Sequence, residues 1–362
     1  MSNESNIRTV ITGTGSYIPP HNKTNKSFET QHFYTETHER IVSTGVDIVN
    51  KFEQITGIRE RRYANADIDT SGMAALAGLS AIHHAGIDPE TIDQVIVAHN
   101  FADIAQYTIQ SDAVPSLASR VKHHIGIKNP SCIAYDILFG CPGWLQGIIQ
   151  ADLFIRAGAA KRCLVIGAEK LSSVIDAYDR DSMIFSDGAG AVIIEAKTGS
   201  DSNAGCLGSK ACTFSTEELN YINMGISNLP GADPSHRYLK MQGRKVYEFA
   251  LKHVPEAIRD CMDSCGINIA EIKKIFIHQA NEKMDGAIIK ALYKLYNADV
   301  NVADIMPMNI HLLGNSSVAT LPTLYDMVCR HNLHGHELKT GDIIVFASVG
   351  AGMNINAMCY RC

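Results

Sequence analysis

The chain has 362 residues, of which 46% are hydrophobic and 19% charged, and this composition excludes a disordered or collagen-like protein. Lysine and arginine total 32 against 38 aspartates and glutamates, a net charge of −6 that argues against nucleic acid as the main partner. The longest apolar stretches, such as residues 163–168 and 343–347, are far shorter than the ~18 residues of a membrane-spanning helix. Residues 1–9 lack the apolar segment of a signal peptide, so we expect a cytoplasmic protein without a membrane span.

Short β-branched segments alternate with amphipathic segments along the chain, which is typical of an α/β fold with mostly parallel, buried sheets. Residues 197–210 carry Gly, Ser, Asn and Asp with little apolar content. We therefore divide the chain into two halves, residues 1–198 and 199–362. The expected strands are residues 9–12, 94–98, 162–166, 191–195, 274–278, 342–347 and 354–358.

The second half repeats features of the first. The pattern GID, I and VIV between residues 86 and 97 recurs 180 residues later as GIN, I and IFI, and LVI at 164–166 recurs as IVF at 344–346. LFGC, which ends at Cys141, matches LLGN, which ends at Asn315, at an offset of 174. These matches predict a duplicated α/β unit with a pseudo-twofold axis. Cys141 and Asn315 then stand at equivalent helix starts and face each other near that axis.

Cys141 lies between Gly140 and Pro142, directly before a nearly uncharged segment that runs to Ala157. Pro142 favours a first helical turn, and apolar side chains all around the segment are typical of a helix buried in the protein centre. The free N–H groups and dipole at such a helix start favour a thiolate. We therefore predict that Cys141 is a nucleophile with a lowered pKa. An inert buried cysteine is the alternative, and it suits the other nine cysteines better.

His278 follows the expected strand at residues 274–277, and α/β folds place active sites at the carboxyl ends of parallel strands. A thiol nucleophile also needs a nearby imidazole. Asn315 begins the sequence Asn-Ser-Ser, which matches an N-glycosylation pattern, and an Asn before a helix is often only a cap. Its equivalence to Cys141 makes Asn315 a candidate catalytic donor.

The ten cysteines are spread over the chain, and we expect them to be reduced. Cys359 and Cys362 have the spacing of a zinc knuckle, but no second Cys or His pair accompanies them. We therefore expect no metal site.

Five motifs stand out along the chain: Asp136-x4-Cys141-x-Gly143, Asp179-Arg180, SDGAGA at 186–191, HQAN at 278–281 and GNSS at 314–317. Together they closely resemble the β-ketoacyl-acyl carrier protein (ACP) synthase III family of condensing enzymes in fatty-acid and polyketide synthesis. Residues 56–61 (TGIRER) and 350–352 (GAG) resemble further family elements, and the resemblance spans residues 10–357. It implies the thiolase fold, in which two pseudo-symmetric αβαβα halves form a five-layered core.

The resemblance also implies the chemistry. Cys141 is the residue that becomes acylated, and the backbone N–H groups of Cys141 and Gly352 form the oxyanion hole. His278 and Asn315 stabilise the enolate that forms when a carrier-bound thioester loses carbon dioxide, and one such donor is typically worth ~3 kcal/mol of barrier. A Claisen condensation with a malonyl- or β-ketoacyl thioester follows, without a metal or redox cofactor.

Some residues depart from the family pattern. Counting back from Gly57, Lys51 stands where the family has a tryptophan that stacks on coenzyme A (CoA), and Ile55 stands where it has an arginine for a CoA phosphate. These departures favour a donor bound to ACP over acetyl-CoA, and acyl-CoA remains an alternative. Lys283 replaces a carrier-contacting arginine, and we expect it to bind the carrier or its phosphopantetheine arm together with Asn281 and Lys290.

Other interpretations stay open. The ketosynthases that form dialkylresorcinols, as in flexirubin-type pigment pathways, look similar; they condense a β-ketoacyl chain with a second acyl unit and cyclise it. A hypothesis from a different class is a non-catalytic thiolase-fold partner subunit. Hydroxymethylglutaryl-type and plant-type polyketide synthases match less well, since residues 349–352 lack the Pro of the plant enzymes. By analogy we expect a homodimer paired through the sheet edge of the first half, and an acyl pocket lined from residues 101–119.

Overall fold

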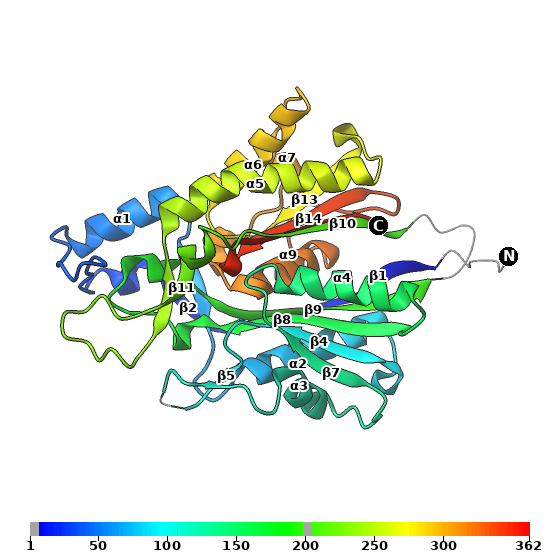
Figure 1. The fold of residues 1–362 in the computed structure, drawn as a ribbon, viewed down its shortest axis with the longest axis horizontal. Coiled ribbons are helices and arrows are strands. Elements are labelled where there is room, and N and C mark those ends of the chain that lie inside the picture. The colour runs from blue at the N-terminus through cyan, green and yellow to red at the C-terminus, as the bar shows by residue number, and fades with distance from the viewer. Residues whose placement is uncertain (1–6, 107, 198–203) are drawn as a thin grey trace.

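Two β-sheets alternate with three layers of helices across the molecule (Figure 1). The computed structural model describes residues 7–106, 108–197 and 204–362. Within these residues, no helix is long and apolar enough to cross a membrane.

The first sheet has five strands in the order β1-β9-β8-β4-β7. Strands β8, β4 and β7 are parallel, and β9 is antiparallel to both of its neighbours, β1 and β8. Strand β7 is therefore an edge strand. The bounds are β1 (Arg8–Tyr17), β4 (Gln94–Ala98), β7 (Ile133–Ile137), β8 (Arg162–Lys170) and β9 (Asp187–Lys197).

The second sheet has the order β10-β15-β14-β13, which repeats the order of the first sheet up to β4. The pair β13 and β14 is parallel, and β15 is antiparallel to both of its neighbours. The matched sequences therefore fall on equivalent strands, β4 with β13 and β8 with β14, and the predicted duplication is confirmed. The bounds are β10 (Gly205–Thr213), β13 (Ile272–Ile277), β14 (Ile343–Gly350) and β15 (Asn354–Arg361).

The helices form three layers. Helices α4 (Gly143–Arg156) and α9 (Thr320–Cys329) lie between the two sheets and share one core with them. Helices α2 (Thr70–Ala85) and α3 (Leu117–Ile125) cover the outer face of the first sheet. Helices α5 (Gly243–Ser264) and α6 (Glu282–Leu295) cover the outer face of the second (Figure 1). This is the five-layered thiolase arrangement.

Helix α4 confirms the buried central helix expected after Cys141. Trp144, Leu145 and Ile148 have at most 2% of their surface exposed. Leu153, expected among the buried residues, is instead 55% exposed near the end of the helix. Gly158 follows the helix in the left-handed conformation (φ +73°), which glycine adopts without strain.

Smaller elements surround the layers on the side where the site lies. A fourth cluster of buried apolar side chains packs beneath α1, around Phe52, Ile58 and Phe185. The boundary expected at 198/199 falls outside the described residues, but each sheet draws its strands from one expected half. The remaining bounds are α1 (Gly45–Thr56), β2 (His21–Thr24), β3 (Glu60–Tyr63), β5 (Asp103–Ile104), β6 (Ser111–Asp112), β11 (Ile222–Gly225), β12 (Tyr238–Met241), α7 (Val302–Ile305) and α8 (Ile310–Leu313).

Candidate active site

Cys141, His278 and Asn315 line one cavity of about 190 Å³, which we call the active-site cavity. Cys141 lies in the turn between β7 and α4, His278 directly follows β13, and Asn315 lies between α8 and α9. The first half therefore supplies the sulfur, and the second half supplies the imidazole and the carboxamide. The rest of the lining is mainly apolar, with Phe101, Leu138, Leu171, Phe185, Ile222, Met224, Leu239, Met241, Val246, Met284 and Val349 among its residues.

The environment of Cys141 opposes ionisation of its thiol. Burial raises the pKa of Cys141 to about 11, even though the Ser317 hydroxyl donates a hydrogen bond to Sγ that lowers it. The predicted lowering of this pKa is therefore wrong for the free enzyme. The reason is that loss of solvation outweighs the favourable field at the start of α4.

A chain of hydrogen bonds runs from the Cys141 sulfur through Ser317 and Asn100 to Glu169. Ser317 Oγ lies 3.2 Å from Cys141 Sγ, and Asn100 Nδ2 donates to Ser317 Oγ at 3.1 Å. Because Ser317 Oγ accepts from Asn100, its own proton is free to point at the sulfur. Asn100 is itself fixed by the buried Glu169, whose two carboxylate oxygens accept from the backbone N–H (3.0 Å) and from Nδ2 (2.6 Å) of Asn100.

His278 is a neutral imidazole in this environment. It is 3% exposed, and burial lowers its pKa to about 4. Its Nδ1 lies 2.7 Å from Thr320 Oγ1, which in turn lies 3.0 Å from the carbonyl oxygen of Ser317. When the Thr320 hydroxyl donates to that carbonyl, it accepts from Nδ1–H and Nε2 is a base. When the hydroxyl turns to Nδ1, Nε2 carries the proton and becomes a donor.

Asn315 is positioned by its own turn. Its Oδ1 accepts from the backbone N–H of Ser317 at 2.8 Å, so Nδ2 is the group left to donate into the cavity. Its backbone also pairs with the segment around Phe185, through hydrogen bonds of 2.9 Å to Ile184 and from Ser186. Ser317 has a positive φ of 52°, an uncommon conformation for a non-glycine residue that places strain beside the nucleophile.

Close backbone packing brings residues 350–352, which we call the glycine loop, to Cys141. A Cβ on Gly140 (φ +65°) would lie 2.6 Å from the backbone nitrogen of Ala351, and a Cβ on Gly350 would lie 2.4 Å from the nitrogen of Cys141. Ala351 lines the active-site cavity. Gly352, expected to supply the second oxyanion-hole N–H, does not border this cavity, and a Cβ there would meet the Asn354 side chain.

A second cavity of about 460 Å³, the outer cavity, adjoins the active-site cavity and shares Met241, Val246, Ala280 and Met284 with it. Lys51 and Ile55, the departures on α1, both line the outer cavity. Two further cations, Arg180 and Arg244, border it. Asp47 and Asp181 line it as well, so the cavity carries charges of both signs. Arg180 is paired with Asp181 (3.4 Å) and Arg244 with Glu248 (2.9 Å), whereas Lys51 is exposed.

The expected carrier-binding residues lie in different places. Asn281 lines the outer cavity, and its side chain caps α6 by accepting from the N–H of Met284. Lys283 is exposed in the first turn of α6. Lys290, further along α6, borders a separate depression beside Lys294 and is not part of the outer cavity.

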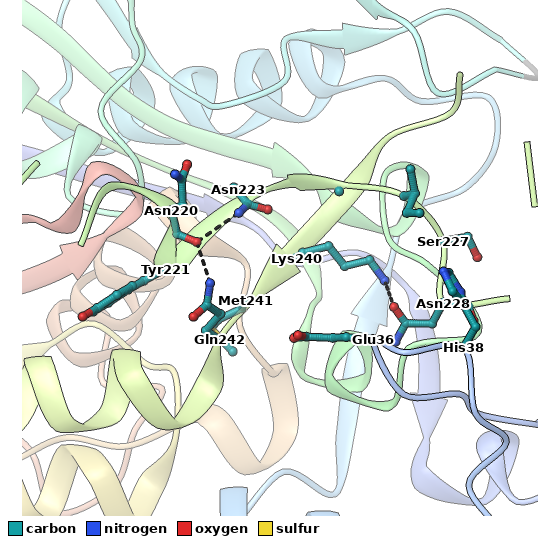
Figure 2. A pocket seen from close by; sticks show the side chains of 12 residues that line it. Glu36, His38, Asn220, Tyr221, Asn223, Ser227, Asn228, Lys240, Met241 and Gln242 are labelled. Atoms are coloured by element: carbon teal, nitrogen blue, oxygen red, sulfur yellow. Dashed lines mark hydrogen bonds between the residues drawn. The ribbon is translucent and has the colours of Figure 1, made fainter. Parts of the chain in front are cut away.

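A polar pocket of about 190 Å³ lies at the hairpin of β11 and β12 (Figure 2). There Lys240 contacts Asp176 (2.6 Å), Asp179 (2.9 Å) and Asn228 (2.8 Å). Figure 2 shows Lys240 reaching Asn228, and the Asn220 carbonyl accepting from Asn223 and Gln242. These contacts hold the hairpin, which also lines the active-site cavity through Ile222 and Leu239. The polar pocket thus supports the cavity wall.

Sequence reasoning gave no role to Ser317, Asn100, Glu169 or Thr320. Ser317 belongs to the GNSS motif, two residues after Asn315, and this proximity was the available signal. A second signal was Glu169, which directly follows the apolar residues 163–168 in the sequence. The structure buries this carboxylate fully, and buried carboxylates are rare unless they are paired. Of the segment expected to line the acyl pocket, Phe101 does border the cavity.

Comparisons with known proteins agree with this arrangement. The model of the 3-oxoacyl-[acyl-carrier-protein] synthase III family matches residues 135–213, and the model of its C-terminal part matches residues 262–362. The chain is 31% identical to a β-ketoacyl-[acyl-carrier-protein] synthase III of Erythrobacter litoralis over 98% of its length and 99% of the relative's. It is 34% identical to one of Clostridium acetobutylicum, with coverages of 97% and 98%.

Solved structures show the same fold. The 3-oxoacyl-[acyl-carrier-protein] synthase III of Aquifex aeolicus superimposes with a TM-score of 0.78 at 29% identity, over 98% of this chain and all of the other. The chain therefore belongs to the β-ketoacyl-ACP synthase III family of thiolase-fold condensing enzymes, which are acyltransferases.

Proposed function

We propose that Cys141 accepts an acyl group and that a carrier-bound extender thioester is then condensed with it. The observation that carries this proposal is the joint presence of Cys141, His278 and Asn315 in one mainly apolar cavity that adjoins the outer cavity. Retention of all three side chains argues against a non-catalytic partner subunit.

In the first step, Sγ of Cys141 attacks the donor thioester while Nε2 of His278 takes the thiol proton. The proton then passes to the departing carrier thiol, so the step begins and ends with neutral enzyme groups. The high pKa of Cys141 makes transfer concerted with attack the favourable route, since a free thiolate is scarce at neutral pH.

In the second step, the extender loses carbon dioxide and its thioester becomes an enolate. Asn315 Nδ2 and, in its other tautomer, His278 Nε2–H donate to the enolate oxygen. The carbanion attacks the acyl carbonyl on Cys141, and the resulting oxyanion is held by the backbone N–H of Cys141 and of Ala351. Collapse of this oxyanion breaks the bond between the acyl carbon and Sγ and releases the β-ketoacyl thioester, and the Cys141 thiolate takes up a proton from solvent. We assign Ala351 in place of Gly352 because Ala351 borders the cavity.

We propose that ACP delivers the substrates through the outer cavity. Lys51 and Ile55 line it without offering the stacking surface of a tryptophan or the phosphate contacts of an arginine at these two positions. Lys51 in this cavity and Lys283, exposed on the adjacent α6, are the cations that we assign to an acidic carrier. The test is kcat/KM with acyl-ACP for Lys283→Glu. Lys290→Glu on the same helix is the matched control, and equal losses would reject the assignment.

We also propose a homodimer in which β7 pairs with its copy. Strand β7 is the edge of the first sheet, and an unpaired edge is a template for another strand. Ile133 at its start is 56% exposed, and Leu138 just after it is 73% exposed. Ile133→Lys is expected to shift the molar mass in light scattering from dimer to monomer; an unchanged dimer would exclude this interface.

The experiment for the function is mass spectrometry of the Cys141 peptide after incubation with acyl-ACP or acyl-CoA of several chain lengths. An acyl adduct that Cys141→Ala abolishes supports the proposal, and no adduct with any donor would overturn it. Product analysis with malonyl- and β-ketoacyl-ACP side by side then distinguishes a simple β-ketoacyl product from a cyclised dialkylresorcinol.

A further inference from the structure

Three cysteines that are far apart in the sequence meet on the outer side of the second sheet. Cys261 and Cys265 lie one helical turn apart at the end of α5, and Cys359 lies on β15. Their three sulfur atoms all lie within 4.8 Å of one another, and Sγ of Cys261 is 3.7 Å from Sγ of Cys359. Cys359 and Cys362, the pair with knuckle spacing, belong instead to different cores.

We propose that Cys261, Cys265 and Cys359 form a binding site for a thiophilic divalent cation, Zn²⁺ or its analogue Cd²⁺. Thiolates are the ligands that such ions prefer, and each cysteine gives up its proton to solvent on binding. A Zn–S bond of about 2.3 Å places two sulfurs of a four-coordinate ion about 3.8 Å apart. The separation of 3.7 Å between Cys261 and Cys359 already has this value.

The backbone of β10 approaches the three sulfur atoms closely. A Cβ on Gly208 would lie 2.5 Å from Cys265 Sγ, so a side chain at that position would displace this sulfur. Gly208 follows a register irregularity in β10, and its carbonyl oxygen lies 3.6 Å from Cys261 Sγ. The carbonyl oxygen of Ala357 lies at the same distance of 3.6 Å from this sulfur. A tetrahedral ion with bonds of about 2.3 Å to sulfur and about 2.1 Å to oxygen separates the two atoms by about 3.6 Å, so either carbonyl is a suitable fourth ligand.

The burial of the three cysteines differs in a way that suits a structural site. Cys261 and Cys359 are fully buried, whereas Cys265 is partly exposed and gives an ion access from solvent. A bound ion would tie the end of α5 to β15 and β10, at the opposite end of β15 from the glycine loop. We therefore expect the ion to stabilise the fold without taking part in the chemistry at Cys141.

The test is titration of the full-length protein, reduced and freed of metal, with Cd²⁺, followed by the thiolate-to-metal charge-transfer absorbance. All titrations use Cys141→Ala so that the active-site thiol does not contribute. We expect one equivalent of Cd²⁺ to bind, Zn²⁺ to compete for it, and both ions to raise the temperature of unfolding.

The matched variants distinguish a specific three-cysteine site from nonspecific binding of Cd²⁺ to other thiols of the protein. Cys265→Ser, at a partly exposed position where folding is not at risk, and Cys359→Ala are each expected to weaken Cd²⁺ binding at least tenfold. Cys163→Ala removes a buried thiol from the first sheet and is expected to bind like its parent. Equal binding by Cys265→Ser and Cys163→Ala would overturn the proposal. A Cys261–Cys359 disulfide that persists in the reduced preparation would also overturn it, and a mass 2 Da lower would reveal it.

Discussion

The hydroxyl of Ser317 donates a hydrogen bond to Cys141 Sγ across 3.2 Å, and 176 positions separate the two residues in the chain. This contact joins the two halves at the nucleophile. It also supplies a side-chain donor that favours the thiolate in a pocket whose burial disfavours it. The reactivity of Cys141 is therefore controlled from the half that also carries His278 and Asn315.

Ser317→Ala is expected to raise the pKa of Cys141 further and to slow its reaction with iodoacetamide about tenfold at a fixed pH, because a hydrogen bond to a charged group is worth about 1.5 kcal/mol or more. The rate of alkylation against pH measures both effects. Ser316→Ala, at the buried neighbouring position, is the control. An unchanged alkylation profile for Ser317→Ala would show that the contact does not influence the thiol.

Thr320→Val removes the hydroxyl that lies between His278 Nδ1 and the Ser317 carbonyl. We expect acylation of Cys141 and decarboxylation of the extender both to fall about tenfold, with KM little changed, because the imidazole loses the group that sets its tautomer. Thr320→Ser keeps the hydroxyl and is expected to retain most of the activity. Equal rates for the Val and Ser variants would exclude this positioning role.

The lowered pKa of His278 predicts how stability depends on pH. The folded protein holds the imidazole neutral down to about pH 4, whereas the unfolded chain protonates it near 6.5. The unfolded state therefore binds more protons between these values, so the stability that the neutral imidazole contributes is fully present above pH 6.5 and is lost as pH falls. By pH 5 the loss in the free energy of unfolding is about 2 kcal/mol.

The free energy of urea unfolding at pH 7.5 and pH 5 measures this loss. His278→Asn has no imidazole at the position, and its stability is expected to fall by about 2 kcal/mol less over the same range. The NMR signals of the His278 ring are expected to stay at their neutral positions from pH 8 to pH 5. A ring that titrates near 6.5 would contradict the prediction.

Lys240→Met leaves the buried Asp176 and the largely buried Asp179 without their shared cation. Burial acts to raise the pKa of Asp176, but hydrogen bonds from Lys240 and from backbone N–H groups outweigh it, and the pKa is lowered. Removing one partner of a buried pair costs about 3–5 kcal/mol. We expect a loss of this size in urea unfolding, and none with Lys252→Met on the exposed face of α5.

Gly140→Ala and Gly158→Ala form a matched pair, because both glycines have a positive φ (65° and 73°). A Cβ on Gly158 meets no other atom within 4 Å, whereas one on Gly140 would lie 2.6 Å from the Ala351 nitrogen. Gly158→Ala is expected to cost about 1 kcal/mol of stability with full activity. Gly140→Ala is expected to lose most of its kcat by displacing the glycine loop. Comparable kcat values for the two variants would exclude the close approach as a requirement.

The duplicated pattern made much of the fold predictable. Gly86 and Gly266 both follow a helix with nearly the same φ (65° and 67°), and Asp88 and Asn268 both cap the short 3₁₀ helix that comes next. Such turn and cap chemistry is local, so sequence reveals it directly. The same repeat correctly brought Cys141 and Asn315 to one cavity.

The surroundings of the catalytic side chains could not be predicted in this way. The contact of Ser317 with Cys141 depends on a positive φ at Ser317, which no residue preference of serine indicates. The raised pKa of Cys141 depends on the depth of burial, and a helix start alone says nothing about that depth. Lys283 and Lys290 were both expected to bind the carrier from one helix. Only the structure shows that Lys290 borders a separate depression and not the outer cavity.

The reacting groups are divided between the two halves of the chain, and these halves join between β9 and β10. A chain cut between these strands would leave the sulfur nucleophile on one fragment and its two polar partners on the other, with α4 and α9 as their mutual contact surface. Neither fragment could turn over substrate alone. Recovered turnover on mixing would show that the two halves reassemble without a covalent link between them.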